Sequence, residues 1–228
     1  MGMEWTVLSV GGSIIVPDEI DVKMLKSLRA LLLPMLKRRK FALVIGGGKT
    51  ARKYMNAAKE ANPKISKDLR DGIGIKATHI NEMLLYAVFE KEADRHLLTS
   101  RPKQIRTNKR LILGAGWDVG ASTDYNAVQL AKILKARTVI NLTNVDYVYD
   151  KNPKKFRDAK PQPNLTWTQF KRIIGGKWTP GANVPFDPIA SRLAERLGLT
   201  VMVLDGRKLD NVRKCLQGKS FKGTVISR

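Results

Sequence analysis

The sequence has few of the features that mark secreted or membrane proteins. Its single cysteine, Cys215, excludes an internal disulfide framework and is typical of a reducing compartment, so we expect a cytoplasmic protein. No apolar run approaches the roughly 18 residues that a membrane span needs. The N-terminal segment has no basic region ahead of its apolar residues, and it is predicted to form a first strand and not a signal peptide. We therefore expect no membrane partner.

Acidic residues are scarce relative to basic ones. Twenty Asp and Glu oppose 42 Lys and Arg, which gives a formal net charge of +22. The excess is even along the chain, because residues 1–114 hold 22 basic and 11 acidic residues while residues 115–228 hold 20 and 9, so each half carries +11. Such a basic globule favours anionic partners, among them nucleotides and nucleic acid. A general bias toward basic surfaces would explain the same number.

The residue types that several enzyme classes need are also rare. There are only two histidines, His79 and His96, and their positions, mid-helix and at a strand start, favour structural or exposed roles. With one cysteine the chain offers no zinc-ligand set, and its serines lack a convincing histidine partner for nucleophilic catalysis. Phosphoryl transfer needs neither, because it depends on cations and backbone donors placed around the transferring group.

What the sequence does contain is an alternation of short apolar segments with segments of helical period. The 228 residues allow one sizeable domain with its own core. The alternation predicts an α/β protein with a parallel-rich sheet covered on both faces, and the proline-rich residues 150–165 are expected to be a loop. We expect strands at 5–10, 41–45, 95–99, 110–113, 138–142, 200–204 and 223–227, and helices at 21–39, 49–61, 72–92, 124–135, 166–174, 187–197 and 209–216.

Three of the predicted strands are followed by glycine-rich loops. These loops are SVGGS at 9–13, GGGKTAR at 46–52 and GAGWDVGASTD at 114–124, and the last two lead into predicted helices. Ligands of parallel sheets bind at the carboxyl ends of the strands. Glycine lets backbone N–H groups approach a phosphate, and a helix N-terminus adds partial positive charge. The three loops together predict a phosphate-binding site at one edge of the sheet.

A fourth loop, TNVDYVYDKNP at 143–153, extends this pattern into a family resemblance. Together with VGGS at 10–13, GGGKTARKY at 46–54, DGIGI at 71–75 and STDYNAVQLA at 122–131, it resembles the amino-acid-kinase family, and within it the archaeal-type uridylate kinases, which phosphorylate UMP with ATP. The resemblance covers nearly the whole chain.

The resemblance implies a fold and an assembly as well as an activity. The expected fold is a single three-layer α/β/α sandwich with a mainly parallel central sheet. Its N-terminal lobe, about 1–123, would hold the phosphoryl acceptor, and its C-terminal lobe, about 124–228, would hold ATP. The resemblance also implies Mg²⁺ with the ATP, a role in pyrimidine biosynthesis and a homo-oligomer, commonly a hexamer.

The resemblance also implies site residues. The basic residues expected to act in catalysis are Arg52, Lys49 and Lys177. ATP would contact three regions: the first glycine loop, the start of the helix that follows the second glycine loop, and the fourth loop. These residues are Ser9, Val10, Gly11, Gly12, Ser13, Gly48, Arg52, Thr143, Asn144, Tyr149 and Asn152. UMP would contact the following residues: Gly47, Asp71, Trp117, Asp118, Val119, Gly120, Ala121, Ser122 and Thr123.

Each of these roles has a structural alternative. Asp71 could cap the helix after it, Arg52 could be a solvated helix charge and Tyr149 could be a core residue. Trp117 is expected to line the acceptor pocket, but the loop at 100–109 or a neighbouring subunit could cover it instead. No direct metal ligand is identified; Asp146 and Asp187 are candidates for organising cationic side chains.

The chain departs from the family pattern at four positions. Ser9 stands where many relatives in the wider superfamily have lysine, although archaeal uridylate kinases also lack that lysine. Tyr147 replaces a glycine, Asn152 replaces an aspartate, and Trp117 replaces a small residue. Two other functions therefore remain open: a kinase of the same fold acting on another small phosphate, and a non-catalytic anion- or nucleotide-binding protein. The net charge of +22 leaves a third open, a nucleic-acid binder.

Overall fold

Seven strands form one sheet at the centre of the molecule. The computed structural model describes residues 3–153, 155–175 and 185–228, and its strands run across the sheet in the order β3-β2-β1-β4-β6-β7-β5. The strands are β1 (Trp5–Val10), β2 (Lys40–Ile45), β3 (Leu111–Gly114), β4 (Thr138–Thr143), β5 (Asn164–Thr166), β6 (Thr200–Asp205) and β7 (Thr224–Ser227).

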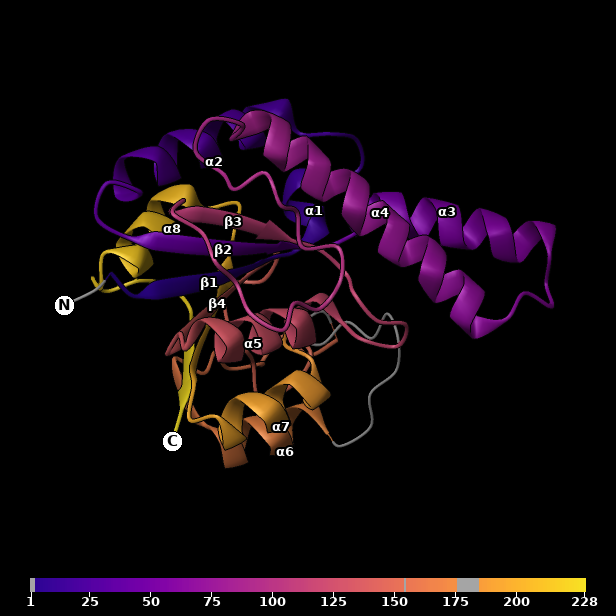
Figure 1. The fold of residues 1–228 in the computed structure, drawn as a ribbon. Helices are drawn as coiled ribbons and strands as arrows, with labels where there is room; N and C mark the ends of the chain where they lie inside the picture. The colour runs from indigo at the N-terminus through magenta and orange to yellow at the C-terminus, as the bar shows by residue number, and fades with distance from the viewer. Residues whose placement is uncertain (1–2, 154, 176–184) are drawn as a thin grey trace.

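The strand directions give the sheet two distinct edges. β3, β2, β1, β4 and β6 are parallel, whereas β7 pairs antiparallel with β6 and parallel with β5. In register, Val10 at the end of β1 is level with Ile45 and Leu142. We call the edge where the five parallel strands end the carboxyl edge, and the edge where they begin the amino edge. In Figure 1 the arrowheads of β1, β2 and β3 point to the carboxyl edge.

Helices cover both faces of the sheet. One face packs on α1 (Gly12–Ile15), α2 (Val22–Met35), α4 (Lys67–Val88) and α8 (Leu209–Leu216), and the other on α5 (Thr123–Leu134), α6 (Trp167–Ile174) and α7 (Pro188–Arg196). Neighbouring strand residues point to opposite faces, as Val7 and Leu8 of β1 do by joining different core clusters. The predicted three-layer α/β/α architecture is confirmed.

Side-chain caps set where the helices begin. The Asp21 carboxylate accepts the Met24 N–H at 2.8 Å at the start of α2. Ser122 does the same for Tyr125 at the start of α5, and Thr166 and Gln169 form a reciprocal capping box at α6. Such caps satisfy backbone donors that the first helical turn leaves unpaired.

Four local predictions need correction. Residues 95–99 are not a strand; they contribute one isolated bridge, Leu98 to Gly114. β5 lies at the end of the segment predicted to be a loop, and it forms only because β7, from the far end of the chain, pairs with it. The first glycine loop continues into the short helix α1. The helix predicted to begin at residue 72 is α4, which begins at Lys67 with Ser66 as its cap.

One pair of helices extends beyond the sheet. α3 (Gly48–Ala61) packs along α4, and the two project from the carboxyl edge as a hairpin (Figure 1). No side chain of α3 is buried. Within the three described ranges, no helix combines the length and the apolar character that crossing a membrane requires.

Candidate active site

The first two glycine loops meet backbone to backbone at the carboxyl edge. A Cβ atom placed on Gly12 would lie 2.0 Å from the Gly48 nitrogen, and Gly48 itself has a φ of +59°. The loops are held by the neighbouring strands, since the Gly11 N–H donates to the Leu142 carbonyl and the Gly46 N–H donates to the Val10 carbonyl, both at 2.9 Å. Only glycine allows this approach, so the two loops form one continuous backbone surface.

The start of α3 has no side-chain cap, and of its first N–H groups the Lys49 N–H donates to the Val16 carbonyl at 3.4 Å. Its N-cap residue, Gly47, provides no side-chain hydrogen bond, and the first turn contains no acidic residue. The loop is fixed from behind, because the Asn81 amide of α4 donates to the carbonyls of Gly46 and Gly47 at 2.9 and 3.2 Å. An uncapped helix N-terminus on a rigid glycine loop is suited to bind a phosphate.

The first turns of α3 also carry three basic side chains with different surroundings. Lys49 forms an ion pair with Asp18, and its hydrogen bond and charge lower the pKa of that carboxyl. Lys53 pairs with Glu19 at 2.6 Å. Arg52 is exposed and makes no ion pair with any residue that the structure describes. Lys49 and Arg52 are the two predicted catalytic cations on α3, and of these only Lys49 is paired with a carboxylate among the described residues.

A partly buried carboxylate lies against the first glycine loop. Asp124, in the first turn of α5, accepts the Ser9 hydroxyl at 2.9 Å and the Asp187 backbone N–H at 3.1 Å. Burial raises its pKa to about 6, and the nearby Asp187 charge adds to the shift. Asp124 thus links β1 to the start of α7. Asp124 was not among the site residues predicted from the sequence, although an acidic residue at the end of the glycine-rich loop 114–124 was a usable signal.

The two aspartates expected to organise cations behave differently. Asp146 accepts two hydrogen bonds from the Lys208 ammonium, at 2.6 and 2.7 Å. Asp187 instead caps α7, accepting the N–H groups of Ile189 and Ala190 at 2.6 and 2.7 Å. Only the Asp146 prediction describes a contact with a cation.

The predicted nucleotide residues of the C-terminal lobe converge on one cavity of about 210 Å³. Thr143, Asn144, Tyr149 and Asn152 all line it, and Tyr147 meets the Tyr149 ring edge-on with centroids 6.4 Å apart. Tyr149 is half-buried, so its ring faces this cavity and is not enclosed in the core. The cavity also has apolar walls, including Ile173 and Ile174, which suits a flat ring system with polar edges.

The predicted acceptor loop lines a second cavity, of about 260 Å³. It is bounded by residues 118–122 together with Tyr125, Asp187, Ile189 and Arg101. Arg101 donates to the Asp118 carboxylate at 2.6 Å, which ties this loop to the segment after Leu98. Asp187 lies in the wall of this cavity and also touches Asp124 through its backbone, so the cavity adjoins the first glycine loop.

Trp117, by contrast, is a core residue. Its side chain is 8% exposed and packs with α5, and its indole N–H donates to the Leu98 carbonyl at 2.7 Å. It is not among the residues that line the neighbouring cavity. The indole is therefore covered within the chain, by α5 and by the Leu98 segment that precedes the loop at 100–109, and not from the acceptor-loop cavity.

α4 supplies further contacts that sequence reasoning missed. The Gly116 N–H donates to the Thr78 hydroxyl at 2.8 Å, and the Gly116 carbonyl lies 2.9 Å from His79 Nε2. α4 therefore holds the third glycine loop as well as the second. Asp71 lies in the second turn of α4, so the alternative that it caps the helix is wrong. It is half-buried and forms no ion pair with the described part of the chain.

The other predicted site residues are those at 120–123 and Lys177. Gly120 has a φ of +78° and shapes the acceptor loop, while Ser122 and Thr123 begin α5. Lys177 lies outside the described residues, and its catalytic role stays a prediction. Among the described residues no group of three or more His, Cys, Asp or Glu side chains is arranged to hold a metal ion.

Comparison with known proteins gives a consistent match. The model of the amino acid kinase family matches residues 4–205. Uridylate kinases of Methanospirillum hungatei and Thermococcus onnurineus are 33% and 32% identical to this chain, covering 99% and 96% of it and 96% and 98% of their own lengths. The crystal structure of uridylate kinase from Archaeoglobus fulgidus superposes with a TM-score of 0.80 at 30% identity, covering 97% of this chain and 99% of that one.

Proposed function

The chain belongs to the amino acid kinase family, and on that premise we propose that it transfers the γ-phosphoryl group of ATP to UMP, giving ADP and UDP. The observation that carries the proposal is the convergence of the first two glycine loops at the uncapped start of α3. This surface adjoins the acceptor-loop cavity through Asp124 and Asp187. The proposal assigns the acceptor to the N-terminal lobe, about 1–123, and ATP to the C-terminal lobe, about 124–228.

The reaction we propose is direct. A phosphate oxygen of UMP attacks the γ-phosphorus in line, the new P–O bond forms, and the bond to the β-phosphate oxygen breaks as ADP leaves. A phosphomonoester oxygen is already largely ionised at neutral pH, so no general base is needed. The protein's task is to place the two nucleotides and to stabilise the charge that develops on the transferring group.

The backbone donors and Arg52 are suited to that task. The N–H groups of Gly12, Ser13, Gly47 and Gly48 would hold phosphate oxygens, because those of Gly11 and Gly46 already donate to strand carbonyls. The Arg52 guanidinium, which forms no ion pair with the described residues, would reach the γ-phosphoryl group. Lys49 forms an ion pair with Asp18, so it would bind the phosphates only if a phosphate oxygen replaced the Asp18 carboxylate as its partner. Thr143, Asn144, Tyr149 and Asn152 would bind ATP, and Asp71 would bind the UMP ribose.

Ser9 gives this site a specific organisation. The residue is neutral, so the first glycine loop brings no side-chain cation and the cationic work falls to Arg52, Lys49 and the predicted Lys177. Ser9 instead donates to Asp124, which also binds the start of α7. Asp124 is thus a positioning residue that fixes the first loop against the C-terminal half.

The donor would enter as MgATP. The described residues offer no metal-holding group of three His, Cys, Asp or Glu side chains, so we place the ion on the phosphates of the substrate. A homo-oligomer, a hexamer by family resemblance, and a cytoplasmic location are also part of the proposal.

A coupled assay of purified protein with ATP, Mg²⁺ and a panel of nucleoside monophosphates tests the proposal. We expect UMP to be the best acceptor, with CMP and AMP poorer. Turnover of a different small phosphate, such as isopentenyl phosphate, in preference to UMP would favour a kinase of another specificity on this fold. Folded protein that binds nucleotides and turns over none of the acceptors would contradict the enzymatic proposal.

A further inference from the structure

Four consecutive basic residues, Lys37-Arg38-Arg39-Lys40, lie at the amino edge of the sheet, where α2 ends and β2 begins. The proposed active site is at the carboxyl edge, so phosphoryl transfer does not use this run. Lys37, Arg38 and Arg39 are exposed, and the Lys40 ammonium lies over the Trp5 ring, 5.4 Å from its centroid.

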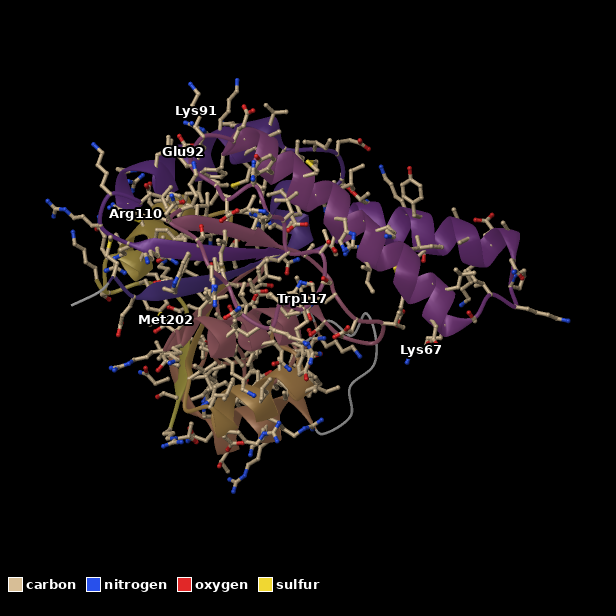
Figure 2. The ribbon with its side chains drawn as sticks, in the orientation of Figure 1. Lys67, Lys91, Glu92, Arg110, Trp117 and Met202 are labelled. Carbon is tan, nitrogen blue, oxygen red and sulfur yellow. The ribbon has the colours of Figure 1, made fainter. Side chains whose placement is uncertain are left out.

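The backbone of this run is held in one conformation. The N–H groups of Arg38 and Arg39 both donate to the Met35 carbonyl, at 3.0 and 2.9 Å. Arg110, which precedes β3 and is labelled in Figure 2, donates to the carbonyls of Leu36 and Lys37 at 3.1 and 2.6 Å. A basic run whose backbone is already ordered loses little backbone entropy when it binds a ligand.

A second helix brings more positive charge to the same place. α8 ends beside α2, and its last turn carries Arg213 and Lys214, with Lys219 in the segment that follows. Between the two helix ends is a hollow of about 410 Å³, lined by Pro34, Met35, Arg38, Arg39, Arg213, Leu216 and Gln217. Three arginine residues therefore line one depression in the surface.

These cations lack acidic partners within the protein. Among the described residues, Lys37, Arg38, Arg39, Arg213, Lys214 and Lys219 form no ion pair. Acids near this edge have other partners: Glu4 is 3.7 Å from Arg137, with both side chains largely exposed, and Glu92 pairs with Arg29 at 3.1 Å. The partial negative charge at the ends of α2 and α8 attracts cations, but that effect is confined to the last helical turn and does not account for Arg39, Lys40 and Lys219.

We propose that this surface, formed by Lys37–Lys40, Arg110, Arg213, Lys214 and Lys219, binds the phosphate backbone of double-stranded nucleic acid without reading its sequence. Arginine forks match phosphate oxygens, and several cations in fixed positions fit the regular phosphates of a duplex. The proposal is independent of the UMP kinase activity, because it uses the opposite edge of the sheet.

The surface chemistry favours a duplex over an unpaired strand. Proteins that hold single strands stack the bases on aromatic side chains. The strongly exposed aromatic side chains among the described residues, Tyr54 and Phe156, lie on α3 and in the 150–163 loop, away from this surface. Trp5 is half-buried, with Lys40 over its ring.

Fluorescence anisotropy with a fluorescein-labelled 20-base-pair duplex of mixed sequence tests the proposal. The test variant is R38Q/R39Q/R213Q. The matched control is K23Q/K26Q/K59Q, which removes the same charge from exposed positions on α2 and α3. At 50 mM salt we expect the test variant to raise Kd at least about tenfold and the control to raise it less than about twofold. The slope of log Kd against log salt should fall by about two to three in the test variant, since each lost phosphate contact removes about 0.9.

Each other outcome overturns the proposal. Equal weakening in the two variants would mean that binding follows net charge alone. No binding by the wild type, or binding to vesicles of phosphatidylserine but not to the duplex, would exclude a nucleic-acid surface. If the test variant melts earlier than the control, R38K/R39K/R213K replaces it. That variant keeps the charge and should bind within about threefold of wild type, and a loss as large as that of the glutamine variant would contradict a phosphate-binding role.

Discussion

The two edges of one sheet carry basic side chains in opposite settings. At the carboxyl edge Lys49, Lys53, Arg101 and Lys208 each form an ion pair with a carboxylate, whereas Arg52 forms none with the described residues. At the amino edge the run 37–40 and the end of α8 have no such partners among the described residues. At the carboxyl edge acids neutralise the neighbours of Arg52 and leave its charge for a small anion, whereas at the amino edge several adjacent cations without internal partners suit a large anion.

The difference also shows what arithmetic along a sequence misses. Each half of the chain carries +11, which indicates an evenly basic globule. A chain of parallel βα units returns to both edges of the sheet again and again, so each half contributes to both. Charge that is even along the chain is thus uneven in space: the segments 37–40 and 213–219, far apart in sequence, meet at one edge.

We expect the largest effect from a substitution that separates the two glycine loops at the carboxyl edge. Gly12→Ala places a methyl group 2.0 Å from the Gly48 nitrogen, so the two glycine loops must separate. We expect UMP turnover to fall by more than about 1000-fold, because donors of both loops move together and a 1 Å misplacement alone can cost about 100-fold. The measurement is steady-state kinetics. Gly72→Ala is the matched control, since no atom lies within 4 Å of its added Cβ, and wild-type activity in both variants would refute the loop contact.

The next effect tests Arg52, the cation in the first turns of α3 that forms no ion pair with the described residues. Arg52→Ala should lower kcat by about 100-fold or more while the KM for UMP changes little, because a guanidinium beside developing phosphoryl charge acts mainly in the transition state. Lys53→Ala, which removes the neighbouring paired cation, should lower kcat less than about threefold. A rise in KM alone for Arg52→Ala would make Arg52 a ground-state contact.

A third prediction concerns an acidic residue that, unlike the exposed cations of the two edges, is buried. Glu82 of α4 is fully buried, and burial raises its pKa from 4.5 to about 7 against a smaller opposing effect of the Leu98 backbone. The folded state therefore binds this proton more tightly than the unfolded chain does. Its contribution to the free energy of unfolding is present below pH 4.5 and is lost as the pH rises to about 7, by about 3 kcal/mol.

Glu82→Gln should remove that pH dependence. Urea unfolding at pH 5 and pH 8 should give a smaller difference for the variant than for the wild type, and Glu60→Gln, an exposed change, should leave the difference intact. Burial also raises the pKa of Asp124, to about 6, so the remaining slope should lie between about pH 4 and pH 6. An unchanged slope in Glu82→Gln would show that the carboxyl group is solvated.

The smallest effect concerns repulsion at the amino edge. R38Q/R39Q should raise the melting temperature by about 1–2 °C at low salt, because it removes like charges that face one another without acids between them. The gain should vanish in 1 M salt, where exposed charges are screened. Lys53→Gln, at the carboxyl edge, should give no gain, since it removes a paired cation. Equal gains in the two variants would erase the distinction between the edges.

Much of the fold could be predicted because its signals are local. Trp5–Val10 is a strand by its apolar run, and the structure places β1 at those residues. Caps such as Asp187-Pro188 mark helix starts in the sequence itself. Prediction failed where pairing is remote: β5 depends on β7, and residues 95–99 have apolar character but form only an isolated bridge to the end of β3.

The candidate site was predictable to a similar limit. The glycine loops can be found in the sequence, because only glycine tolerates the contact between Gly12 and Gly48. The residues that support these loops cannot be found in this way. Thr78, His79 and Asn81 occupy ordinary helical positions, and their contacts exist only once α4 is packed in the fold. The burial of Trp117 is equally a tertiary fact, because it depends on the Leu98 carbonyl across the fold.

The helix that carries Arg52 has a consequence for how the protein unfolds locally. α3 buries no side chain, and a 14-residue helix is marginal by itself in water. Contacts with α4 and with the glycine loop at its start stabilise α3. We therefore expect its amide protons to exchange with solvent well before those of β1 and β2. A phosphate bound at that start would add the missing cap, and protection from exchange would then spread along α3. Substrate binding and the local folding of this helix thereby become one equilibrium.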